Sequence, residues 1–192
     1  MYRLTYGNTN TYLIMGAQGG LLVDTGYAGM LPAFYQALKK EGLQVRDIAF
    51  VMATHYHPDH CGLIGELMQQ GVQLLLVEEQ QEHVHFADSI FARDRLPYVP
   101  VQETGARVIR CEESREFLKS LGIDGEIFST PSHSPDSVSL MLDSGECLVG
   151  DLEPYEYLAA YEENEPLRRD WEAVLARHPK RIGYAHVNEK EL

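Results

Sequence analysis

The sequence is poor in cysteine, in basic residues and in long apolar runs, and each shortage excludes a class of protein. Its 192 residues include three cysteines, Cys61, Cys111 and Cys147. This odd number at wide spacing disfavours a disulfide framework and suits a reducing compartment. Lysine and arginine total 16 against 29 acidic residues, and the net charge of −13 disfavours nucleic acid as a partner, because phosphate contacts need clustered cations.

No apolar run approaches the roughly 18 residues that a membrane span needs. The first residues, MYRLTYGNTNTYLI, contain no uninterrupted apolar stretch and no small-residue cleavage site, so they do not resemble a signal peptide. No shift in composition marks a linker. We therefore expect a cytoplasmic protein of one domain, residues 1–192, with a small-molecule substrate and neither a membrane nor a nucleic acid as partner.

Several of the chain's histidines are concentrated in one short stretch. The chain has eight histidines, and three of them stand with an aspartate in the stretch THYHPDHCG, residues 54 to 62. Chance would give the pattern H-x-H-x-D-H in roughly one chain in a thousand of this length, so the cluster calls for an explanation.

Apolar periodicity predicts mixed strands and helices along the whole chain. We expect two sheets covered by helices, with no internal repeat. The predicted strands are 3–6, 10–15, 20–24, 48–54, 72–77, 107–110, 125–130, 137–143, 146–151 and 181–186. The predicted helices are 30–40, 61–71, 78–94, 112–121 and most of 154–178.

The histidine cluster follows directly on the predicted strand 48–54. His55 and His57 are two positions apart, so their side chains leave the same face and can converge on one ion. Pro58 ends the strand and starts a turn, which lets Asp59 and His60 reach a neighbouring point. Imidazole and carboxylate ligands without a thiolate suit Zn²⁺ best, with Fe²⁺ or Mn²⁺ as further candidates.

Three later strand ends supply further residues of the same types. His133 follows the strand GEIFST, Asp151 ends the strand ECLVGD, and His186 ends the strand RIGYAH. Strand ends that meet at one edge would bring these side chains to the histidine cluster, although an ordinary strand-end role stays open for His186.

With these pieces in place, the chain resembles the metallo-β-lactamase-fold hydrolase superfamily. The matching segments are NTYLI, LLVDTG, THYHPDH, TPSHSPDSVSL, VGDL and GYAHVN, which run from residue 10 to residue 188 in the family's order. The resemblance implies an α+β fold, a four-layer αββα sandwich with a dinuclear metal site at one edge of the two sheets. The chain departs from the family at Ser132, Asp136 and Val187, where glycine is common, so loops around the substrate should differ.

The resemblance also implies a role for each matched residue. His55, His57 and His133 would bind the first metal; Asp59, His60 and His186 the second; Asp151 would bridge both. The metals would be two Zn²⁺ ions, with Fe²⁺ or Mn²⁺ possible. A hydroxide shared by both ions would be the nucleophile, Asp59 would orient it and receive its proton, and Asp24 would support the metal loop through hydrogen bonds.

The function expected is therefore metal-dependent hydrolysis of a small-molecule ester, thioester or lactone. Three alternatives stay open: a phosphodiester or phosphoester hydrolase, an Fe²⁺ sulfur dioxygenase with one metal on the same fold, and a metal-binding protein without catalysis. We expect residues 80–104 and 152–165 to shape specificity.

Other polar and aromatic residues have simpler interpretations. His83 and His85 should lie on a solvated surface, and Cys61 should be a small buried residue rather than a ligand. Tyr98, Tyr155 and Tyr157 either line the pocket or pack elsewhere, and packing is favoured.

Overall fold

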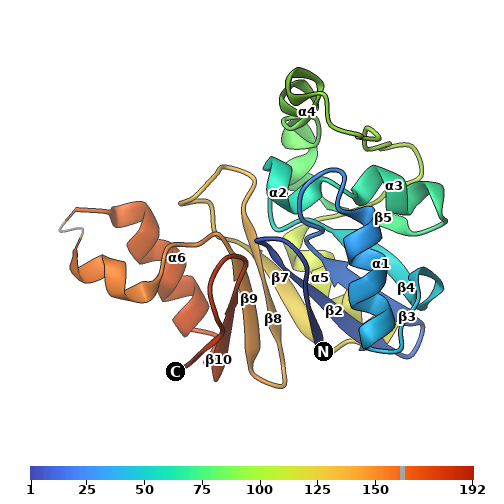
Figure 1. Cartoon of the computed structure of the whole chain (residues 1–192). Helices are drawn as coiled ribbons and strands as arrows, with labels where there is room; N and C mark the ends of the chain where they lie inside the picture. The colour runs from blue at the N-terminus through green and yellow to red at the C-terminus, as the bar shows by residue number, and fades with distance from the viewer. Residues whose placement is uncertain (161–162) are drawn as a thin grey trace.

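The computed structural model of the chain describes residues 1–160 and 163–192. Within them, eleven strands form two sheets with helices on both outer faces, which is the expected αββα arrangement (Figure 1). The strands are β1 Tyr2–Thr5, β2 Asn10–Gly16, β3 Gly19–Val23, β4 Ile48–Met52, β5 Gln73–Val77, β6 Arg107–Ile109, β7 Gly125–Ser129, β8 Val138–Leu142, β9 Glu146–Gly150, β10 Arg181–Tyr184 and β11 Lys190–Glu191. The helices are α1 Leu31–Lys40, α2 Pro58–Cys61, α3 Ile64–Gln69, α4 Asp88–Asp94, α5 Ser114–Leu121 and α6 Glu165–Leu175, with short 3-10 helices η1 Val45–Asp47, η2 Glu78–His83, η3 Cys111–Glu113 and η4 Tyr155–Ala159.

The first sheet has the order β1-β2-β3-β4-β5-β6 and the second the order β11-β10-β9-β8-β7. β1, β2 and β3 form the predicted antiparallel meander, and β3 to β6 are parallel to one another. In the second sheet β9 and β10 are parallel. Parallel neighbours bring their carboxyl ends to the same edge, so the segments that follow β3, β4, β9 and β10 can meet there.

Alternation along the strands divides the interior into three apolar layers. In β5, Leu74 and Leu76 face the helices, whereas Leu75 and Val77 face the other sheet. The second sheet packs its outer face on α6 around the fully buried Trp171. Each sheet is therefore covered on both sides, which explains why its central strands are apolar at nearly every position.

Several predicted elements differ from the structure in their extent. The single helix expected at 78–94 is divided into η2 and α4, because Phe86 N–H bonds to the His83 carbonyl three residues back and the turn buries Val84 and Ala87. The helix expected at 61–71 corresponds to α3, which covers Ile64–Gln69 only, and a separate short helix, α2, precedes it from Pro58, since proline fits the first turn of a helix.

In the last third of the chain, the helical region expected at 154–178 consists of η4 and α6, and residues 161 and 162 within it lie outside the described residues. The last predicted strand, 181–186, ends at Tyr184, and β11 was not predicted. Among the described helices, none is both long and apolar enough to cross a membrane.

Candidate metal centre

Four strand ends deliver the predicted residues to one edge of the two sheets. β4 ends at Met52, shortly before the loop of His55 and His57, and α2 then carries Asp59 and His60. The loop after β7 carries His133, while Asp151 follows β9 and His186 follows β10. The structure brings all seven side chains together in three overlapping groups: His55, His57 and His133; His55, His60 and Asp151; Asp59, His60 and His186.

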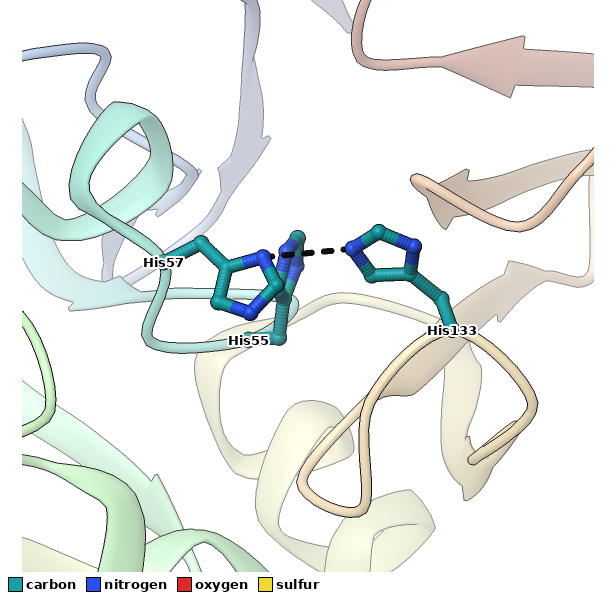
Figure 2. Close-up of side chains that lie close together, drawn as sticks. All are labelled: His55, His57 and His133. Atoms are coloured by element: carbon teal, nitrogen blue, oxygen red, sulfur yellow. Dashed lines mark hydrogen bonds between the residues drawn. The ribbon is translucent and has the colours of Figure 1, made fainter.

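The first group consists of three imidazoles that face one another from both sheets (Figure 2). His133 Nε2 lies 3.2 Å from His57 Nδ1. The His55 ring lies 4.4 Å from that of His57 and 4.8 Å from that of His133, measured between centroids. Three nitrogens within 4.8 Å of one another can surround one cation, and His55 and His57 converge as expected for residues two apart at a strand end.

Asp151 lies between this group and the group of Asp59, His60 and His186. Its Oδ2 is 3.4 Å from His60 Nε2, 3.6 Å from His133 Nε2 and 3.9 Å from His55 Nε2. Its Oδ1 is 3.1 Å from His186 Nε2, which in turn is 3.1 Å from Asp59 Oδ2. One carboxylate thus faces both groups, the position that a bridging ligand requires.

Asp24, which follows β3, supports the cluster through contacts with Thr54 and His60. Its Oδ1 accepts a hydrogen bond from Thr54 N–H at 2.7 Å, and its Oδ2 lies 3.0 Å from His60 Nδ1. Asp24 is buried and has a left-handed backbone with φ of 61°, a strained conformation of the kind that collects at functional sites. The supporting contact expected for Asp24 is present.

Two further residues, which sequence reasoning did not assign, join the loops of the cluster. Buried Gln80 donates from Nε2 to the carbonyls of Ala53, Thr54 and Asp136. The Asp136 carboxylate accepts from Tyr56 N–H at 2.7 Å, between the two histidines of the first loop. Asp136 stands where the family often has glycine, so this departure has a structural role: it ties the His133 loop to the His55 loop.

The protonation states of the cluster suit a cation. Burial, reinforced by the neighbouring imidazole of His60, depresses the pKa of His55 far below its ordinary value, and burial beside His133 also lowers the pKa of His57. Burial would raise the pKa of Asp151, but its contacts with His60 and His186 outweigh burial and lower it. Neutral imidazoles and an ionised carboxylate leave lone pairs free for a metal.

The surroundings of His60 favour a positive charge more directly. Burial by itself would lower its pKa, but the carboxylates of Asp24 and Asp151 outweigh that effect and raise the pKa to about 10. A site that holds a proton this strongly provides negative potential that a metal ion would also neutralise.

Three buried atoms of the cluster have polar neighbours but form no well-aligned hydrogen bond among the described residues: His55 Nε2, His60 Nε2 and Asp151 Oδ1. Buried polar atoms are normally satisfied, and each one left without a partner costs about 1 to 3 kcal/mol. All three face the centre of the cluster, so a bound cation is the partner that they fit. Gly150, the residue before Asp151, lets the backbone pass close to Thr54, because a Cβ there would lie 2.5 Å from Thr54 Oγ1.

The remaining candidates lie away from the centre. His85 is exposed and contacts Asp88 and Glu103, as expected for a surface histidine. Cys61 is buried with its Sγ directed at the Tyr56 carbonyl. Tyr98 packs on Phe91 and donates to Asp88, and Tyr155 packs on Trp171, so both pack as favoured.

Comparison with known proteins agrees with this geometry. The family model described as the metallo-beta-lactamase superfamily matches residues 4–186. The "Beta-lactamase-like protein 2 homolog" of Drosophila melanogaster is 27% identical over 186 residues, and the "Probable metallo-hydrolase MJ0888" of Methanocaldococcus jannaschii is 28% identical over 152 residues. These matches cover 96% and 76% of this chain, but 60% and 68% of the respective relatives.

Solved structures share the fold at low identity. The metallo-beta-lactamase family protein TTHA1429 of Thermus thermophilus superposes with a TM-score of 0.77 at 21% identity, covering 99% of this chain and 74% of that one. TTHA1623, solved in a di-iron-bound form, gives a TM-score of 0.73 at 21% identity, covering 100% of this chain and 94% of that one.

Proposed function

Because the chain belongs to the metallo-beta-lactamase superfamily, we propose that it is a metal-dependent hydrolase of a small-molecule ester, thioester or lactone. His55, His57 and His133 would hold one metal ion and Asp59, His60 and His186 a second. Asp151 would contribute to both. We extend the proposal to a single domain over residues 1–192, which is supported by the central core that the two sheets share.

One observation carries the proposal: Asp151 presents one oxygen to His55, His60 and His133 and the other to His186, while buried nitrogens of His55 and His60 form no well-aligned hydrogen bond among the described residues. Zn²⁺ fits such nitrogen and oxygen donors, and so does Fe²⁺. The di-iron form of TTHA1623 supports iron as a candidate beside zinc.

When bound, two such cations lower the pKa of a shared water and polarise the carbonyl oxygen under attack. The protein's own groups would do the rest. Asp59 is about one-quarter exposed, so its carboxylate can meet a water from the solvent side and accept its proton. His186 Nδ1 lies 2.9 Å from the Asn8 carbonyl, and this contact orients the ring so that Nε2 faces Asp59 and Asp151.

The alternatives differ in what they predict for the purified protein. A sulfur dioxygenase would hold about one iron per chain and consume oxygen with a persulfide; a phosphoesterase would act on phosphodiesters or phosphomonoesters; a binding protein would hold metal without turnover. The proposed hydrolase should contain about two metal ions per chain by elemental analysis. It should hydrolyse members of an ester, thioester and lactone panel, lose that activity on removal of metal by a chelator and regain it on reconstitution. One iron per chain with oxygen uptake would instead establish the dioxygenase.

Replacing Asp151 by alanine should reduce bound metal to half or less, because one side chain faces both groups. The measurement is plasma spectrometry after dialysis against metal-free buffer. Asp143, an exposed carboxylate paired with Arg115, provides the control, since its alanine variant removes the same charge outside the cluster. Two metals per chain in the Asp151 variant would remove this residue from the site.

A further inference from the structure

Two hollows adjoin the candidate metal centre and share His133 and Glu153. One, of about 290 Å³, is bordered by Asp151 and His186 of the centre. The other, of about 200 Å³, lies beyond Glu153 and is bordered by Ser132 and Asn164. A substrate whose scissile carbonyl lies at the centre and which fills both hollows would therefore contact Glu153.

The larger hollow offers an apolar surface beside the centre. Leu152, Pro154, Tyr184 and Val187 contribute to its wall, and Val187 is half exposed. Such a surface suits an alkyl part of a small molecule, while the few polar groups decide orientation.

Apart from the metal ions proposed for the centre, the formally charged side chains that border the two hollows are acidic. Of the described residues that border them, none is lysine or arginine, and Glu153 adds a carboxylate to those of the centre. No ion pair or hydrogen bond of the described residues engages the Glu153 carboxylate. Lys190, carried by the segment after Val187, is paired with Glu156 instead.

The backbone of Glu153 is held by the core. Its carbonyl accepts a hydrogen bond from Trp171 Nε1 at 2.8 Å, and Trp171 is fully buried against the second sheet. The hollow beyond it also contains a buried Ser132 Oγ without a partner among the described residues, an acceptor or donor free for a ligand. An unpaired carboxylate that borders a reaction centre selects among substrates by their charge.

We propose that Glu153 is a specificity-determining residue that favours substrates with a positively charged group over anionic substrates of the same size. The inference rests on the proposed hydrolase function and names the substrate class of that site. The net charge of −13 acts in the same direction, because it raises the local concentration of cations and lowers that of anions.

The test uses three thioesters of matched size with an acetyl group on a cationic, neutral or anionic thiol, and a second series with the charge on the acyl side. Released thiol is measured by absorbance, and kcat/KM is compared for the metal-loaded enzyme. A charge pair several Å apart near the surface changes binding by roughly tenfold. We expect the cationic thioester to exceed the neutral one about tenfold in at least one series, and the anionic one to fall about tenfold below it. In that series Glu153→Gln should bring the three close together, and Glu153→Lys should reverse the order.

Glu41→Lys is the matched control, because it changes the net charge equally at an exposed position at the end of α1, on the helix-covered face of the first sheet. It should leave the order of the three substrates unchanged. Hydrolysis of neutral thioesters without discrimination by charge, or discrimination that survives Glu153→Lys, would overturn the inference and leave the hydrolase intact. Failure to hydrolyse any neutral member of the ester, thioester and lactone panel would overturn the proposed function and this inference with it.

Discussion

Replacing Asp59 by asparagine is expected to lower kcat for ester hydrolysis by about three orders of magnitude, equivalent to about 4 kcal/mol in the activation free energy. The carboxylate lies 3.1 Å from His186 Nε2 and 3.8 Å from His60 Nε2, and it is partly open to solvent. It is thus the acidic group of the cluster that can take a proton from an attacking water. Asparagine keeps the size of the side chain but cannot accept that proton, and general-base catalysis contributes about 10² to 10⁴ in rate.

The measurement separates this loss from a loss of metal. Because Asp59 also belongs to a candidate ligand group, kcat is normalised to the metal content of each reconstituted sample. Unfolding by urea should be nearly unchanged, since Asp59 lies on the short helix α2 and its carbonyl, which the substitution keeps, is the acceptor for Thr9 Oγ1. Asp94→Asn, at an exposed carboxylate paired with Arg93, should retain full activity. A normalised kcat within tenfold of the unsubstituted enzyme would contradict the role given to Asp59.

The cluster was predictable because strand ends can be located from local sequence. Runs such as IAFVM and ECLVG are apolar, short and bounded by polar residues, so the positions of His55 and Asp151 just after them follow from the pattern alone. Parallel pairing then brings those ends to one edge. The meeting of β4 with β9 across two different sheets does not follow from any local pattern, and only the resemblance to a family supplied it.

What could not be predicted depends on contacts between distant side chains. Gln80 was part of a helix predicted at 78–94 with no role of its own, yet it is buried and bonds to three carbonyls from two loops. Asp136 had no expected role, because its partner Tyr56 N–H lies 80 positions away. The hollow beside Glu153 arises from three separate segments, and residues 152–165 were expected near the substrate without any indication of which side chain faces it. Single polar residues outside a motif form no periodic pattern in the sequence, so their hydrogen-bond partners can be identified only from the structure.

Replacing Asp24 should have the largest effect on the integrity of the site, and two substitutions separate its two functions. A carboxylate can only accept hydrogen bonds, so beside Asp24 Oδ2 the His60 Nδ1 keeps its proton, and a metal ion would displace the proton on Nε2 and use that lone pair. Asparagine has one oxygen: if it keeps the bond from Thr54 N–H, its amide NH₂ faces His60 and favours the opposite tautomer. Metal affinity of Asp24→Asn should therefore fall 10-fold to 100-fold, as for other groups that orient a ligand.

Asp24→Ala should instead destabilise the protein itself. It leaves the buried Thr54 N–H and His60 ring without their acceptor, which should lower the free energy of unfolding by about 3 kcal/mol even in the metal-free protein. Urea denaturation of metal-free samples measures the free energy of unfolding of Asp24→Ala. Competition with a chromogenic chelator measures the metal affinity of Asp24→Asn. Asp143→Asn, outside the cluster, should change neither. Normal metal affinity in Asp24→Asn would show that another residue sets the tautomer of His60. Normal stability in Asp24→Ala would show that Thr54 and His60 find other partners and that the buried carboxylate has no structural role.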